Sequence, residues 1–129
     1  MAMKQQFATV EPTDAPPKVL CGQVAQHFSG FTAPLLFLRL SVPVYLTRDY
    51  TAKGLLARVK ACGLNELRTR GSTVLDMSHL RDPTSMAALR QLRRIRAAGS
   101  PLSFNVMQDV VRMAEPTKLR VENGYGCTE

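Results

Sequence analysis

The stretch that decides the predicted fold is DPTSMAALRQLRRIRAAG, residues 82–99. Asp82 is a residue type that caps helix N-termini, and Pro83 suits the first helical position. Four apolar side chains then recur at helical spacing and share one face, namely Met86, Leu89, Leu92 and Ile95. Gly99 suits the end of the helix. The sequence therefore predicts an amphipathic helix over residues 83–98, with Leu89 and Leu92 in the core.

Shorter periodic segments lie on either side of this helix. Leu36, Leu38 and Leu40 alternate with other residues, as in a strand, whereas Leu55, Val59 and Cys62 share one face of a helix. The predicted elements are strands at 36–45, 72–77 and 102–107, a helix at 51–62 and a short helix at 108–114. Residues 18–28 fit a helix or a strand equally well.

This order predicts an α+β protein with a small β-α-β-α-β sheet and two helices on one face, a ferredoxin-like arrangement. A chain of 129 residues has the size of one domain. We expect an N-terminal arm over residues 1–34, a core domain over 35–107 and a C-terminal extension over 108–129.

Positive charge is concentrated in one part of the chain. Residues 39–96 hold twelve Lys or Arg and four acidic residues, a net charge of +8, while the whole chain carries +7. Clustered basic side chains gain affinity for a polyanion by displacing its counterions. The basic segment therefore favours a polyanion partner. The alternative is a basic surface that contacts only solvent.

The residues that we expect to contact RNA phosphates are basic and lie within this segment. They are Arg48, Lys53, Arg68, Arg70, Arg81, Arg90, Arg93 and Arg94. Trp is absent and few other aromatic residues are present, so base stacking is not the expected mode of recognition.

Sequence signals for catalysis are missing. The chain has no GxxxxGK[ST], GxGxxG, GxSxG or HExxH motif, and Cys21, Cys62 and Cys127 form no CxxC pair. We therefore expect no enzyme activity, no metal site and no cofactor. No apolar run has transmembrane length, so no membrane partner is expected.

Two segments resemble the large-subunit ribosomal protein L-thirty family, especially its mitochondrial members. Residues 57–67, ARVKACGLNEL, look like the family's first helix, which ends in a Gly-Leu pair. Residues 79–89, HLRDPTSMAAL, look like the entry to its second helix. The resemblance covers residues 36–107 and implies a structural protein of the large ribosomal subunit that binds ribosomal RNA.

A weaker resemblance points to STAS domains. The segment TVLDMS, residues 73–78, followed by residues 89–99 and 102–106, is similar to this family. The resemblance implies a regulatory module that binds partner proteins, with Thr84 or Ser85 near a phosphorylated position.

The ribosomal interpretation implies ribosomal RNA and neighbouring ribosomal proteins as partners, with no small-molecule substrate. It also implies a mitochondrial location on the ribosome, and a cytoplasmic one otherwise.

Overall fold

The computed structural model describes residues 16–22 and 28–124. Its strands are β1 (Val19–Cys21), β2 (Val44–Leu46), β3 (Glu66–Arg70), β4 (Arg94–Ala98) and β5 (Arg120–Asn123). Its helices are α2 (Phe28–Arg39), α3 (Ala52–Cys62), α4 (Gly71–Met77), α5 (Pro83–Gln91) and α6 (Phe104–Met113). The strands form one five-stranded sheet in the order β2-β1-β3-β4-β5, and every neighbouring pair is parallel.

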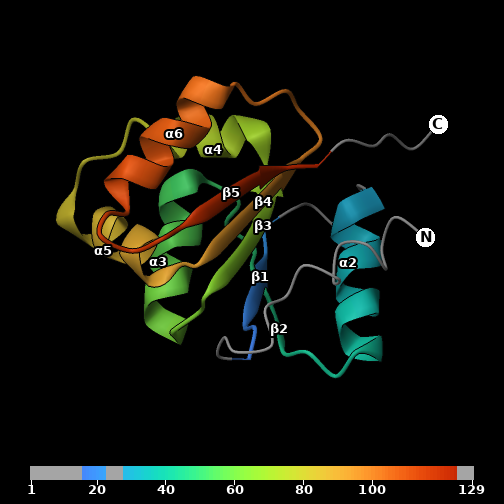
Figure 1. The fold of residues 1–129 in the computed structure, drawn as a ribbon. Helices are drawn as coiled ribbons and strands as arrows, with labels where there is room; N and C mark the ends of the chain where they lie inside the picture. The colour runs from blue at the N-terminus through green and yellow to red at the C-terminus, as the bar shows by residue number, and fades with distance from the viewer. Residues whose placement is uncertain (1–15, 23–27, 125–129) are drawn as a thin grey trace.

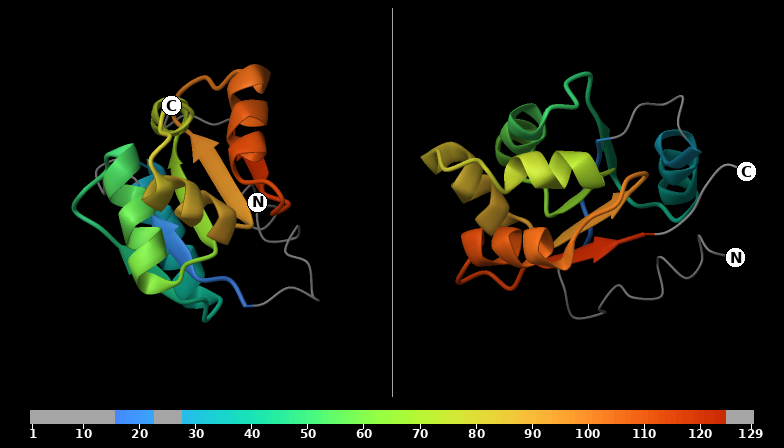
Figure 2. Two further views of the ribbon diagram at one scale, coloured as in Figure 1. Left: turned by 90° about the vertical axis from the view of Figure 1, so that its left-hand side faces the viewer. Right: turned by 90° about the horizontal axis from the view of Figure 1, so that it is seen from above.

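The helices lie on both faces of this sheet (Figures 1 and 2). From β1 the chain moves to β2 in one direction, while from β3 it moves through β4 to β5 in the other. Crossovers between parallel strands are right-handed, so reversing the direction puts the connecting helix on the opposite face. Accordingly α2 lies on one face and α3, α4, α5 and α6 lie on the other, an α/β arrangement wound in two directions.

The main core lies between the sheet and the four-helix face. Leu20, Leu67 and Ile95 point into it from three adjacent strands and are at most 1% exposed. A second, smaller cluster lies under α2, where Phe37 packs with Val19 and Cys21. Side chains alternate across a strand, so neighbouring residues of β1 belong to the two different clusters.

Three of the helices begin at a capping side chain. The hydroxyl of Thr51 accepts from the Gly54 amide at 3.1 Å, and the hydroxyl of Ser103 accepts from the Val106 amide at 3.3 Å. The carboxylate of Asp82 accepts from the Ser85 amide at 3.0 Å, with Pro83 as the first helical residue.

The helix predicted over residues 83–98 is correct in its first half and wrong in its second. Leu89 and Leu92 are fully buried, as predicted. The helix ends at Gln91, and residues 94–98 form β4. The arginines of this segment lie at helical spacing, which favours a helix. However, Arg94 and Arg96 also alternate with Ile95 and Ala97, as in a strand, and the structure follows this alternation.

The three predicted strands need correction. Helix α2 runs through residue 39, so only 44–45 of the predicted strand 36–45 lie in β2. Residues 72–77 lie in α4, and most of 102–107 lies in α6. Both helices bury residues at helical spacing: Val74 and Met77 in α4, and Val110 and Met113 in α6. The helix predicted over 51–62 is confirmed by α3, and that over 108–114 lies mostly within α6.

The prediction of a single sheet with packed helices is confirmed, but the three-stranded ferredoxin-like arrangement is not what the structure has. All five strands are parallel, and helices lie on both faces. Strand β1 comes from the segment 1–34 that we expected to be an arm, and β5 comes from the expected extension 108–129. Residues 1–15 of that arm lie outside the described residues.

Replacing Leu89 by Ala should lower the free energy of unfolding by about 2–5 kcal/mol, because the side chain is fully buried in the main core. Urea unfolding measures this loss. Arg90→Ala, one position along on the exposed side of α5, is the matched control and should change stability by less than about 0.5 kcal/mol. Equal losses in the two variants would contradict the assignment of the core.

Asp82→Ala should destabilise the protein at neutral pH and have little effect in acid. Hydrogen bonds from Ser85 hold the pKa of the Asp82 carboxyl below its ordinary value of 3.8. A lowered pKa in the folded state means that the stabilisation is present above pH 3.8 and disappears as the pH falls through the lower folded value. Urea unfolding at neutral and strongly acidic pH tests this.

The matched control for Asp82→Ala is Asp76→Ala, which removes an exposed carboxylate from α4. A pH-independent loss in Asp82→Ala, or an equal pH dependence in both variants, would show that the cap does not act through its charge.

Candidate ligand site at the carboxyl edge of the sheet

The carboxyl ends of the five parallel strands lie at one edge of the sheet. The direction of winding reverses between β1 and β3, which are neighbours in the sheet. In open α/β sheets, ligands bind in the crevice outside the carboxyl ends of the strands, at such a reversal. This edge is therefore the first place at which a ligand site is expected.

Glycine directly follows four of the five strands. These residues are Gly22 after β1, Gly71 after β3, Gly99 after β4 and Gly124 after β5. A residue without a side chain leaves the neighbouring backbone amides uncovered and allows another group to approach closely. Four adjacent strands are thus each followed by a residue without a side chain.

Two of these glycines are required by the local geometry. A Cβ at Gly71 would lie 2.6 Å from the carbonyl oxygen of Ser100 and 2.9 Å from its hydroxyl oxygen. Gly99 has φ of 84°, in the left-handed region. The loops after β3 and β4 are consequently packed closely against each other.

Hydrogen bonds fix these loops to one another and to the sheet. The Ser72 amide donates to the Ser100 hydroxyl at 2.8 Å, which joins the loops after β3 and β4. The Gly22 amide donates to the Arg68 carbonyl at 2.7 Å, and the Gly124 amide donates to the Ala97 carbonyl at 2.6 Å. The edge is therefore pre-organised, and the loops that carry Ser72, Ser100 and Ser103 are joined by the hydrogen bond between Ser72 and Ser100.

Two ionisable side chains near this edge are shifted by burial. Burial, together with the neighbouring Arg96, lowers the pKa of Arg68 to about 10, so its guanidinium is still cationic at neutral pH. Burial raises the pKa of the Cys21 thiol to about 11, so that thiol is protonated and a poor nucleophile.

The described residues contain no group of three or more His, Cys, Asp or Glu placed to hold a metal ion. None of the helices in the described part of the chain combines the length and apolar character needed to cross a membrane.

The eight residues predicted to bind RNA lie on several elements. Arg68 and Arg70 lie on β3 and Arg94 on β4, whereas Lys53 and Arg90 lie on the helices α3 and α5 of the opposite face. Arg48 and Arg81 lie in the loops before α3 and α5, and Arg93 directly precedes β4. The structure thus brings the strand residues together and separates them from the helix residues.

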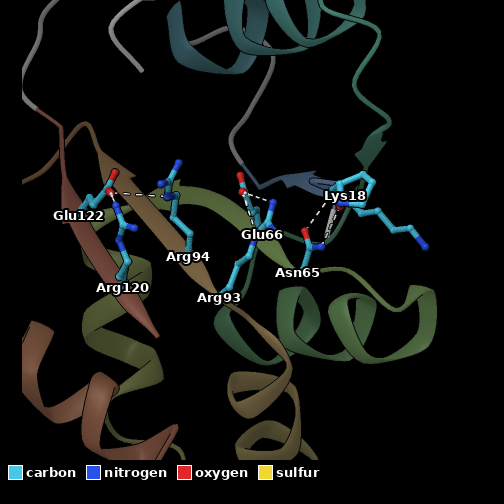
Figure 3. A network of polar contacts seen from close by, with 8 residues as sticks. Lys18, Asn65, Glu66, Arg93, Arg94, Arg120 and Glu122 are labelled. Carbon is cyan, nitrogen blue, oxygen red and sulfur yellow. Dashed lines mark hydrogen bonds and ion pairs between the residues drawn. The ribbon is translucent and has the colours of Figure 1, made fainter. Parts of the chain in front are cut away.

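Several of these side chains are occupied within the fold (Figure 3). Arg93 forms an ion pair with Glu66 at 3.1 Å, and Arg94 forms one with Glu122 at 3.5 Å. Arg81 donates to the carbonyls of Ser78 and Leu80, both at 2.7 Å. The Arg68 guanidinium lies over the ring of Phe37, 5.1 Å from its centroid.

No protein-family model and no curated protein sequence matches the chain. Solved structures do. The luciferase-like enzyme of the nonluminescent mealworm Zophobas morio matches with a TM-score of 0.77 and 15% identity, over 98% of this chain and 28% of that one. The inhibitor-bound N-terminal domain of FACL13 from Mycobacterium tuberculosis matches with a TM-score of 0.74 and 13% identity, over 99% and 31%.

O-succinylbenzoate coenzyme A synthetase (MenE) from Bacillus subtilis, in complex with AMP, matches with a TM-score of 0.70 and 16% identity, over 99% of this chain and 24% of that one. The chain has the fold of a part of these enzymes. It spans less than a third of the length of each.

These similarities overturn the functional interpretation of the sequence. The neighbours are adenylate-forming enzymes, so the assignments to the ribosomal L-thirty family and to STAS domains are wrong. The similarities also contradict two other expectations. One is that the chain is unrelated to enzymes, and the other is that its partners are limited to ribosomal RNA and ribosomal proteins. MenE structures hold AMP or ATP, which also contradicts the exclusion of small-molecule ligands.

The sequence pattern does not predict the glycines of the carboxyl edge. It predicts Gly99 at the end of a long helix and Gly71 outside any element. The signal that could have found them is the pairing of each glycine with a preceding alternating run: Glu66–Arg70 before Gly71, and Arg94–Ala98 before Gly99. A glycine after such a run is typical of a strand that ends at a loop.

Gly71→Ala should lower the free energy of unfolding by about 1–3 kcal/mol, because its Cβ would overlap the backbone oxygen of Ser100. Thermal and urea unfolding measure this loss. Ser72→Ala, at the next and exposed position, should cost less than about 0.5 kcal/mol. A neutral Gly71→Ala would show that the two loops are not closely packed.

Proposed function

We propose that this chain is a segment of an adenylate-forming enzyme and that its carboxyl edge contributes part of the nucleotide site. The observation that carries the proposal is the match of 98–99% of the chain to such enzymes, combined with the glycines that end four adjacent strands. Because the chain spans less than a third of those enzymes, its carboxyl edge would form only a part of such a site.

The chemistry of the edge fits a nucleotide. Phosphate and ribose groups are bound by hydroxyls and backbone groups that approach closely, and the loops after β3 and β4 carry the hydroxyls of Ser72, Ser100 and Ser103. Of the neighbours, MenE has been solved with AMP and with ATP and magnesium. The net charge of +7 further favours an anionic ligand.

The role of the edge follows from its geometry. Gly71 and Gly99 bring two loops together, and the hydrogen bond between Ser72 and Ser100 fixes their separation before any ligand arrives. A site that is already ordered loses little conformational entropy on binding. These loops would position the nucleotide, while the groups that react with it would lie on the rest of the enzyme.

Titration of the full chain with AMP, followed by amide chemical shifts, tests this proposal. The amides of residues 71–73, 99–100 and 102–103 should shift, and adenosine should shift them less because it has no phosphate. Millimolar AMP without any effect on these residues, or with an effect only on the basic residues of α3, would contradict the proposal.

Gly124→Val is the matched variant for this titration. A Cβ at Gly124 meets its nearest atom at 3.4 Å, so the fold accommodates it, but a branched side chain covers the end of β5. We expect AMP to bind this variant more weakly than the wild type, by about tenfold. Ala61→Val, on the exposed side of α3, is the control and should leave the titration unchanged.

A further inference from the structure

Strand β5 lies at one side of the sheet and has an open edge, here called the β5 edge. It pairs with β4 on one side, and among the described residues no strand pairs with its other side. The Arg120 and Gly124 amides donate to carbonyls of β4, so these two residues direct their backbone groups inward. Backbone groups alternate in direction along a strand, so the amide and carbonyl of Val121 point outward. The β5 edge can therefore accept one more strand.

A groove of about 400 Å³ lies beside the β5 edge, between α6 and β5. Phe104, Met107 and Val111 line it from one side of α6, and Val121 lines it from β5. Phe104 is 66% exposed. Helix α6 lies alongside β5 at this side of the sheet (Figures 1 and 2). The apolar surface of α6 thus extends from the core out to the β5 edge.

The β5 edge and its groove are electrically neutral, although the chain carries +7. The charged residues that line the groove are Arg112 and Glu115, and those of β5 are Arg120 and Glu122. Two positive and two negative charges cancel, so the excess positive charge lies elsewhere on the chain. Exposed charges are screened over about 8 Å at physiological ionic strength. A second copy can therefore approach this neutral surface with little repulsion.

The sequence of β5 is complementary to itself in antiparallel pairing. With Val121 opposite Val121 of a second copy, each Arg120 lies opposite a Glu122. Facing residues of opposite charge stabilise an antiparallel pair. The backbone agrees with this register, because two facing residues whose amide and carbonyl point at each other exchange two hydrogen bonds.

The same register brings the two grooves together. Val121 packs against the main core, so its side chain lies on the face of the sheet that carries α6. Facing residues of an antiparallel pair have their side chains on the same face. The α6 helices of both copies would therefore lie side by side on one face, with their apolar sides toward each other.

We propose that the β5 edge and α6 form a two-fold interface with a second copy of this chain, in which the two β5 strands pair antiparallel. The sheets of the two copies would join into one continuous sheet. Phe104, Met107 and Val111 of each copy would be covered by the α6 helix of the other, as in an interface that uses the same patch twice. The proposal does not rest on nucleotide binding, because it uses the side of β5 and not the carboxyl ends of the strands.

Sedimentation of the full chain over a range of concentrations, without nucleotide, tests the proposal. We expect a dimer that dissociates on dilution. Phe104→Asp places a charge in the apolar contact between the helices and should raise the dissociation constant at least about tenfold. Leu38→Asp is the matched control, because Leu38 is also 66% exposed but lies on α2, and it should change the dissociation constant less than about twofold. A monomer at every concentration, or equal effects of the two substitutions, would overturn the proposal.

Cysteine substitutions test the register of the two strands. Under mild oxidation Val121→Cys should crosslink two copies, because facing residues that exchange hydrogen bonds have Cα atoms about 5.5 Å apart. Asn123→Cys is the control. It would lie opposite residue 119 of the second copy and about 14 Å from its own equivalent, too far for a disulfide. The wild type under the same oxidation gives the background from the native cysteines.

Other arrangements give other results, and each would overturn the proposal. A dimer that is lost in Leu38→Asp and kept in Phe104→Asp would place the contact on α2. A dimer that is lost in Phe104→Asp but crosslinks equally in Val121→Cys and Asn123→Cys would show helices that pack without the proposed strand pairing. A monomer that binds an apolar dye through residues 104–111 would show that the groove is a small-molecule pocket.

Discussion

The structure depends on the alternation of side chains along the central strands of a parallel sheet. In β3 and β4, Leu67, Thr69, Ile95 and Ala97 point toward the four-helix core and are almost fully buried. The residues between them are glutamate and arginine and point the other way. A shift of one residue in register would place arginines in the core, so the register of the sheet is strongly determined.

The two faces of the sheet are consequently stabilised by different kinds of interaction. The four-helix face is apolar, and its stability comes from burying side chains such as Leu20 and Leu89. The opposite face is held by α2 on one side and by ion pairs among arginines and glutamates on the other. Ion pairs that remain partly exposed contribute little to stability, so the second face is the weaker one.

The sequence predicted the starts of helices far better than the strands. Thr51, Asp82 and Ser103 all cap helices in the structure. The cap and apolar face predict the helix that begins at Pro83, and the apolar face alone predicts the helix over 51–62. Strands of five residues with arginine at every second position were not recognised, because their arginines also fit a helical repeat. Residues 72–77 were assigned to a strand from composition, although Val74 and Met77 have the spacing of a helix.

The candidate site could not be predicted because it is made by topology rather than by a motif. Gly22, Gly71 and Gly99 are far apart in the chain, and only the strand order brings the ends of their strands together. The basic residues were recognised as a group, but their chemistry depends on which face each one occupies. Arg68 and Lys53 have the same charge, yet one is largely buried in the sheet and the other is exposed on a helix.

Arg68 connects the carboxyl edge of the sheet with the face that carries α2. Its carbonyl accepts the hydrogen bond of Gly22 at the carboxyl edge, its guanidinium lies over Phe37 of α2, and its register neighbour is Arg96 of β4. Burial, and after it repulsion from Arg96, lowers the pKa of Arg68 to about 10, so the surroundings disfavour the charge of this side chain. The same residue therefore holds the loop after β1 through its backbone and contacts α2 through its side chain.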